Sequence, residues 1–180
     1  MNRCDACDDR EYLRAILTAY TAPTVFGGKT GTLVNLCSPT RDLSRCWMCD
    51  ENLRCAIPLA HAEFTNPKGS LLLYFYDRKK LEHRLKDRRC RAFLKNRGYN
   101  YRRADEAIAE LKRRFLTGCP DEIGIFLGYP LSDVEAFCEK RKHRFVGYWK
   151  CYENILLSKI RFFFFDLAKY VAMKRAMQEN

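Results

Sequence analysis

This sequence lacks a long uncharged apolar run. Its most hydrophobic region, residues 155–173, is interrupted by Lys159, Arg161, Asp166 and Lys169. A membrane span needs about 20 consecutive, mostly uncharged apolar residues, so we expect no transmembrane segment. Residues 1–12 contain no apolar stretch of the kind that directs secretion. The ten cysteines are therefore expected to be free thiols of a soluble protein in a reducing cytoplasm.

Histidine is also scarce. His61, His83 and His143 are the three in the chain, and none neighbours a serine or cysteine in a spacing typical of nucleophilic catalysis. Groups that are distant in the sequence cannot be paired from their spacing. Whether the protein is an enzyme therefore stays open at this stage.

A nucleotide P-loop is lacking, although three of its letters are present. Gly28, Lys29 and Thr30 end the stretch APTVFGGKT as they would end a Walker A loop. That loop needs a glycine five positions before its last glycine, where this chain has Pro23. Proline removes a backbone donor and fixes φ. The stretch also follows a predicted helix rather than a strand, so we expect no P-loop.

No low-complexity tract interrupts the chain. Its 180 residues, 47% of them hydrophobic, suit a single domain over 1–180 with its own core, and we expect 1–10 to be a loosely ordered N-terminal segment. Apolar spacing predicts a helix-rich α+β domain with a small sheet. The predicted strands lie near 70–76 and 144–152, with a third within 24–36. The predicted helices cover 8–20, 77–96, 104–118 and 154–177, with two short ones within 119–142.

Capping signals mark several of these helix ends. Asp77 can cap the helix that follows it, and Gly128 can end the first of the two short helices. Ser132 and Glu135 have the spacing of a capping box for the second short helix.

Acidic residues are too few to balance the basic ones. Lysine and arginine number 33 against 22 acidic residues, and residues 77–114 hold 15 basic and 6 acidic side chains, which is most of the excess. Such a surface attracts nucleic acid, acidic proteins or an anionic membrane, and it is equally typical of solvated helix faces. The candidate basic patch consists of Arg78, Lys79, Arg84, Lys86, Arg88, Arg89 and Arg91.

Residues 120–142 resemble a helix-turn-helix. Gly124 supplies a small residue where two helices cross, and Gly128 supplies the turn. The second helix begins with acidic side chains, Asp133 and Glu135, which phosphates repel. A helical hairpin packed in the core is therefore favoured over a nucleic-acid reader.

Two cysteine pairs have the spacing of metal ligands. They are Cys4 with Cys7 and Cys46 with Cys49, and four thiolates of this kind bind zinc or iron. The stretch between the pairs is longer than is usual in zinc ribbons. Cysteines that act as small hydrophobic residues in a reducing compartment are the simpler interpretation.

The predicted C-terminal helix has a very wide apolar face. Residues 162–165 are four consecutive phenylalanines, and such a face is normally covered by the core or by a partner. A dimer through this helix is a second hypothesis about partners.

Three motifs resemble a bacterial family, domain-of-unknown-function family 3793. The family shows P-H-E-I-G-x-F-L-G-Y-P-L-x-D-V, which Pro120 and residues 122–134 match, and then G-Y-W-K-V-Y, which 147–150 and Tyr152 match. Its C-A-P-T-L-A-G-x-K resembles residues 22–29. The resemblance covers most of 13–152. Where the family has cysteine and histidine, this chain has Thr21 and Asp121, so a catalytic pair at those positions would be lost here.

The resemblance implies that these distant motifs converge on one binding face. Lys29 and Glu122 are hard to explain as packing, because buried charges need partners, so we expect them to form an ion pair. An anionic ligand or a protein partner would bind there, and the resemblance also implies an alternative role in anaerobic iron or redox metabolism. The candidate ligand-binding residues are Thr24, Lys29, Glu122, Tyr129, Asp133, Tyr148 and Lys150.

Overall fold

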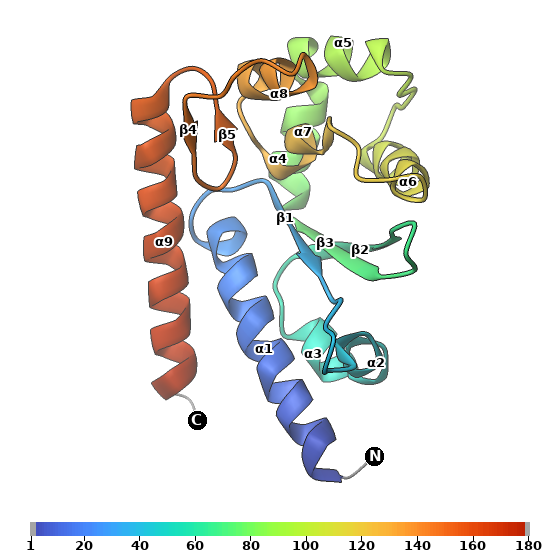
Figure 1. The fold of residues 1–180 in the computed structure, drawn as a ribbon, viewed down its shortest axis with the longest axis vertical. Helices are drawn as coiled ribbons and strands as arrows, with labels where there is room; N and C mark the ends of the chain where they lie inside the picture. Colours follow the sequence, from blue (N-terminus) through green and yellow to red (C-terminus); the bar gives the residue numbers. More distant parts are fainter. Residues whose placement is uncertain (1–2, 179–180) are drawn as a thin grey trace.

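A three-stranded antiparallel sheet lies at the centre of the fold (Figure 1). The structure is a computed structural model and describes residues 3–178. Strand β3 (Leu71–Tyr76) lies between β1 (Gly31–Asn35) and β2 (Ala60–Thr65). Tyr74 is paired with Leu33 on one side and with Ala62 on the other.

Strand β3 separates two hydrophobic cores. Because side chains alternate along a strand, Leu72, Tyr74 and Tyr76 enter one core, whereas Leu73 and Phe75 enter the other. Burial on both faces explains why this strand is apolar and aromatic throughout instead of alternating with polar residues.

Helices cover both faces of the sheet. On one face lie α1 (Arg3–Val25), α2 (Leu43–Cys49) and α3 (Glu51–Cys55), around the buried Trp47. The helices of the other face are α4 (Arg78–Lys86), α5 (Arg88–Asn96), α6 (Ala104–Phe115), α7 (Ile123–Leu127) and α8 (Leu131–Cys138).

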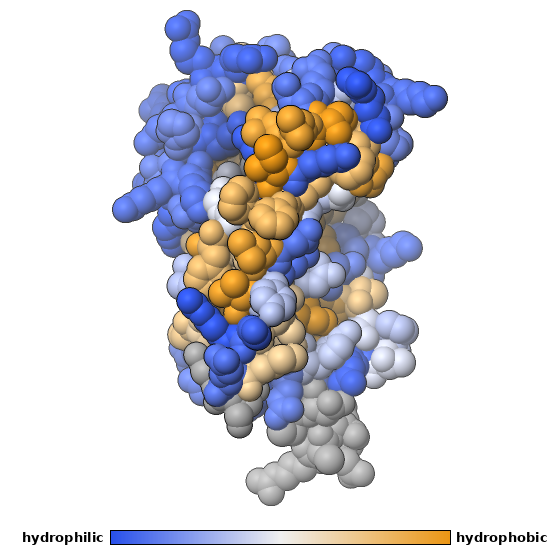
Figure 2. All heavy atoms as spheres, turned by 90° about the vertical axis from the view of Figure 1, so that its left-hand side faces the viewer, coloured by the Kyte–Doolittle hydropathy of each residue, from blue (hydrophilic) through white to orange (hydrophobic). Residues whose placement is uncertain are grey.

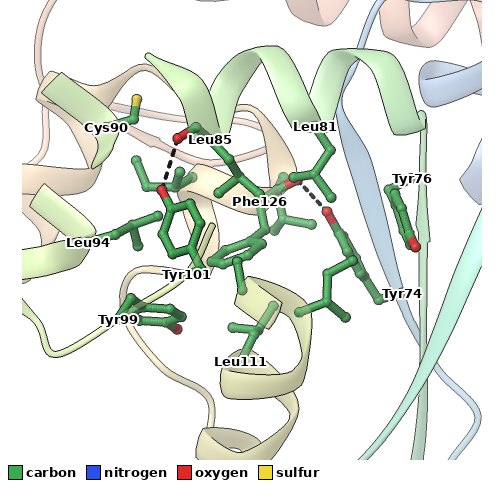
Figure 3. Close-up of a cluster of buried hydrophobic side chains, with 14 of the residues drawn as sticks. Tyr74, Tyr76, Leu81, Leu85, Cys90, Leu94, Tyr99, Tyr101, Leu111 and Phe126 are labelled. Carbon is green, nitrogen blue, oxygen red and sulfur yellow. Dashed lines mark hydrogen bonds between the residues drawn. The ribbon is translucent and has the colours of Figure 1, made fainter. Parts of the chain in front are cut away.

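The core beneath these five helices is fixed by buried tyrosine hydroxyls as well as by apolar contact (Figure 3). The Tyr74 hydroxyl donates to the Phe126 carbonyl oxygen at 2.8 Å, and the Tyr101 hydroxyl donates to the Leu85 carbonyl oxygen at 2.9 Å. These bonds satisfy groups that would otherwise be buried without partners. They tie β3 to α7 and α4 to the segment before α6.

A hairpin and the last helix complete the fold. Strands β4 (Phe145–Val146) and β5 (Lys150–Cys151) pair with each other, and α9 (Ile155–Gln178) follows. Helix α9 runs alongside α1 (Figure 1), where Ala22, Ala168 and Ala172 are buried together. Within residues 3–178, no helix is both long and apolar enough to cross a membrane.

The predicted fold class is confirmed, including strands at 71–76, within 24–36 and within 144–152, although the last region forms a two-stranded hairpin. Residues 3–10 belong to α1, and the single domain over 1–180 and the loosely ordered segment 1–10 stay predictions.

Several element boundaries were predicted wrongly. The first helix continues to Val25 and contains Pro23. The helix predicted over 77–96 is divided at Asp87, whose side chain accepts hydrogen bonds from the Arg89 and Cys90 N–H groups at the start of α5. The Ser132 and Glu135 capping box does not form, because the residue before α8 is Pro130, two positions earlier than Ser132, and the helix begins at Leu131.

Candidate functional site

The loop between α1 and β1 lies against the turn between α7 and α8. Gly28 has a φ of 79° and Gly128 a φ of 81°, a left-handed conformation that glycine adopts without strain. A Cβ on Gly128 would lie 2.5 Å from the Thr30 Oγ1. The two glycine turns are therefore in contact, and the motifs that contain them converge in space.

Lys29 extends from this loop into a small polar and aromatic enclosure. Its Nζ donates to the Thr32 Oγ1 at 3.2 Å, and the Thr32 hydroxyl is 3.1 Å from that of Thr24. The Nζ also lies 5.9 Å from the ring centroids of Tyr129 and Tyr148, within the range of cation–π attraction. The loop thus presents Lys29 to Tyr129, in the turn between α7 and α8, and to Tyr148, between β4 and β5.

The enclosure changes the chemistry of Lys29. Burial, and then the nearby charge of Lys169, lowers the pKa of Lys29 from its usual value to about 8. In the part of the chain that the structure describes, no carboxylate forms an ion pair with it. Lys29 is therefore a half-buried cation whose positive charge is only partly compensated.

The predicted ion pair between Lys29 and Glu122 is wrong. Glu122 is buried and accepts hydrogen bonds from Arg114 at 3.0 Å and from the Tyr99 hydroxyl at 3.1 Å. Arg114 also pairs with Glu110 at 2.7 Å. The buried carboxylate does have a cationic partner, but that partner comes from α6, so Glu122 anchors α7 to α6.

Asp133 is also committed to structure. Its carboxylate accepts from the Trp149 Nε1 at 2.8 Å and from the backbone N–H groups of Tyr152 and Glu153 at 2.9 and 3.2 Å. Trp149 in turn stacks on Tyr129, with 4.8 Å between ring centroids. One carboxylate on α8 therefore fixes the hairpin and holds Trp149 beside the Lys29 enclosure.

A comparison with models of protein families gives a match over nearly the whole chain. The model of the family described as "Protein of unknown function (DUF3793)" matches residues 17–180. The chain belongs to this family. Neither the curated proteins nor the solved structures that were compared give a match.

Thr21 and Asp121, the two positions at which we expect this DUF3793 chain to depart from the family motifs, have separate surroundings. Thr21 is buried in α1, and its hydroxyl donates to the Leu17 carbonyl oxygen at 2.7 Å. Asp121 accepts from Lys140 at 2.9 Å near the surface. Each side chain therefore forms a hydrogen bond with a different part of the chain, Thr21 within α1 and Asp121 with Lys140.

A basic pocket of about 510 Å³ opens beside Lys29. Three parts of the chain supply its positive side chains: the loop after α1, helix α4 and helix α9. Its aromatic wall is formed by Trp149 and Phe165. The remaining lining residues are Gly27, Gly28, Lys29, Thr30, Lys79, Lys80, His83, Arg84, Gly128 and Arg161.

The charge of the basic pocket is unbalanced. Among the described residues, no Asp or Glu side chain lines it, and Asp77 lies 3.5 Å from Lys80 at its edge. Arg84 donates to the Tyr129 carbonyl oxygen, while its buried Nε has no hydrogen-bond partner in the described chain. Several positive groups thus face one cavity, and the buried Arg84 Nε is a donor without a hydrogen-bond partner among the described residues.

An apolar pocket of about 350 Å³ lies on the other side of Trp149. Ile123, Gly124 and Val134 line it from α7 and α8. Three candidate residues, Tyr129, Asp133 and Lys150, line this pocket, whereas Tyr148 lies in a groove beside α9. The seven candidate residues therefore do not line one common cavity.

Sequence reasoning missed several residues of the basic pocket, among them Lys80, His83 and Arg161. Helix α4 carries Lys79, Lys80, His83 and Arg84, and residues three or four apart lie on one helical face. That spacing could have indicated the pocket wall. Arg161 could not have been found, because its position depends on how α9 packs.

The rest of the predicted basic patch lies away from this pocket. Arg78, Lys86 and Arg91 border a different cleft that also contains Glu82 and Asp105. Lys86 pairs with Glu82 at 3.2 Å, so charge there is partly neutralised. Arg88 and Arg89 are exposed at the start of α5.

The helical hairpin of α7 and α8 has the crossing that the sequence predicted. A Cβ on Gly124 would lie 2.7 Å from the Val134 side chain. None of the eight residues of α8 is fully exposed, so this helix leaves little surface for a nucleic-acid groove. Its packing is that of a core element.

The metal hypothesis gains no support from the described residues. Cys46 and Cys49 lie in α2, whereas the side chains of Cys4 and Cys7 are outside the described part of the structure. No group of three or more candidate ligands occurs among the described side chains. Burial, followed by Asp9 and Asp42, raises the pKa of Cys46, which disfavours the thiolate form that metals bind.

Proposed function

We propose that this protein binds a small phosphorylated compound in the basic pocket. The observation that carries the proposal is the convergence of Lys29, Arg84 and Arg161 from three distant segments on one cavity without a lining carboxylate. Charged donors make strong hydrogen bonds to phosphate oxygens. A volume of about 510 Å³ falls within the range of small-molecule sites.

The surroundings favour a small ligand over a long nucleic acid. The basic residues outside the pocket are partly neutralised by neighbouring acids, as in the pairs of Lys86 with Glu82 and Arg113 with Glu110. The aromatic wall formed by Trp149 and Phe165 offers contact to an apolar or planar part of the ligand. Phosphate recognition and a ring contact together define the expected class of compound.

A pair of matched variants tests the proposal. Lys79→Gln with Arg161→Gln removes two exposed cations that line the pocket, and Arg88→Gln with Lys112→Gln removes two exposed cations elsewhere. Calorimetric titrations would use inorganic phosphate, pyrophosphate and ribose 5-phosphate at constant ionic strength. We expect the pocket variant to lose affinity by about tenfold or more, since each charged hydrogen bond is worth about 1.5 to 3 kcal/mol.

The control variant should change affinity by less than about twofold, because screened surface charges contribute little. An equal loss in both variants would show that only net charge matters. Failure of all three probes to bind the wild-type chain would also overturn the proposal.

The remaining predictions about function stay predictions. They are a bacterial and cytoplasmic setting, nucleic-acid binding through 78–114 and 120–142, zinc or iron at the cysteine pairs, and a role in anaerobic iron or redox metabolism. A dimer through the C-terminal helix is likewise a prediction, and it rests on the exposed side of α9.

A further inference from the structure

Helix α9 is apolar on two opposite sides. Its inner side buries Phe162 and Phe165 against the hairpin. Its outer side leaves large apolar residues in the open, with Leu156 75% exposed and Phe163 64% exposed. Figure 2 shows a band of hydrophobic surface that runs down the middle of this face and is interrupted by hydrophilic side chains.

The exposed residues follow the spacing of helices that pack lengthwise. They recur at alternating intervals of four and three positions, which keeps them in one seam along a helix. The exposed seam consists of Leu156, Ile160, Phe163, Leu167, Tyr170 and Met177, with Lys174 at the remaining position. Leu157 and Phe164, 50% and 53% exposed, form a second row beside it.

We propose that the exposed seam binds α9 of a second copy of this chain in an antiparallel arrangement. In the proposed register, Ile160 lies opposite the copy's Phe163, and Leu156 lies opposite the copy's Leu167. With the symmetry-related pairs, this register gives four layers of facing residues, and every layer is entirely apolar. It also brings Leu157 beside the copy's Phe164, which covers the second row.

Charge determines the choice of register. Lys159 and Asp166 flank the seam on the same side, because both border the groove beside the hairpin. They are seven residues apart, about 10.5 Å along a helix, and neither forms an ion pair in the described chain. The antiparallel register places Lys159 beside the copy's Asp166, and symmetry repeats the pair.

The neighbouring register is less favourable. If Phe163 lay opposite the copy's Leu167, four apolar layers would still form, but Asp166 would lie beside the same residue of the copy. Like charges in contact oppose association. The charge pattern of α9 therefore complements itself in one antiparallel register.

A second copy also fits the seam better than a membrane does. Helices that lie on anionic bilayers carry basic residues along their polar flanks, and α9 has such residues. Asp166, however, flanks the exposed seam and would be brought close to the anionic headgroups. The copy instead supplies Asp166 with a lysine. Because α9 is already folded on its own domain, association does not require the unfavourable nucleation of a helix.

Charge reversal tests the register in the full-length chain under reducing conditions. Sedimentation velocity over a wide concentration range should show a dimer for the wild type. Lys159→Asp alone and Asp166→Lys alone should each weaken the dimer by about tenfold or more, because each creates two like-charge contacts. The double variant should recover most of the wild-type affinity.

Two controls separate association from folding. Tyr148→Phe removes the 2.7 Å hydrogen bond that Asp166 accepts without changing charge, and Lys112→Asp introduces a reversed charge on exposed α6. Both should remain dimeric, and circular dichroism should match the wild type for every variant. A monomer at all concentrations, an unrestored double variant, or a monomer that binds anionic phospholipid vesicles would overturn the proposal.

Discussion

At the scale of single residues, Lys29 shows how a half-buried cation is held without a carboxylate. Its Nζ has a threonine hydroxyl and two tyrosine faces as neighbours. The sequence correctly indicated that Lys29 and Glu122 need partners. The sequence could not indicate which residues these partners are, because Arg114 reaches Glu122 only through the packing of α6 against α7.

Replacing Lys29 by methionine should change how stability depends on pH. The pKa of Lys29 is lowered to about 8 in the folded protein, whereas an unfolded lysine titrates near 10.4. Between these values the unfolded chain binds more protons, so Lys29 adds stability as pH rises. Relative to Lys29→Met, the wild type should gain about 2 to 3 kcal/mol of unfolding free energy between pH 7.5 and 10.5.

Urea denaturation of both proteins at several pH values provides this comparison, and the difference between the two curves cancels the titration of all other groups. Lys112→Met, at an exposed site on α6, is the control and should give a flat difference. A flat difference for Lys29→Met as well would mean that the lysine titrates as it does in water.

At the scale of elements, the glycine turn between α7 and α8 positions the basic pocket. Gly128→Ala should destabilise the fold by about 2 to 3 kcal/mol, because the new Cβ must adopt a positive φ and also meets Thr30 at 2.5 to 2.8 Å. Thermal or urea unfolding of the variant measures the effect.

Gly69 is a matched control for this substitution. It has a φ of 77°, close to that of Gly128, but a Cβ added there would have no atom within 4 Å. Gly69→Ala should therefore lower the free energy of unfolding by only about 1 kcal/mol, which is the cost of a positive φ for alanine. Equal costs at both glycines would contradict the close contact between the turn and the loop after α1.

The elements that the sequence predicted are those with strong local signals. Strand β3 is a short apolar run, and Asp77 caps α4 by accepting from the Lys80 N–H. Strand β2, AHAEFT, was missed because it is an edge strand in which only Phe64 is buried and the other residues are exposed or half-exposed. The break at Asp87 was missed because the flanking residues all favour helix.

The candidate site was predictable as motifs but not as cavities. The helix end at Gly128 followed from local rules, since glycine adopts positive φ at low cost. Lys29 and the other candidate residues are divided among separate cavities, and Trp149, which Asp133 holds in place, borders both the basic and the apolar pocket. Such a position results from tertiary contacts and has no local signal.

At the scale of the whole molecule, the basic pocket joins parts that belong to different cores. Helix α4 packs in the core on one face of β3, whereas α9 packs on α1 and the hairpin. The loop after α1 lies between them. A ligand that contacts all three parts would couple the local stability of segments that share few direct contacts.

Hydrogen exchange can detect this coupling. With pyrophosphate bound, amides in 27–31, in α4 and in the first half of α9 should exchange more slowly together, because a ligand that binds only the folded state suppresses local opening. Amides of α5 and α6, which carry other cations but do not line the pocket, serve as the internal control. Protection confined to α4 and α5 would indicate binding to an open basic surface. Joint protection of the three segments requires the ligand to bridge them, which a surface patch on one pair of helices cannot do.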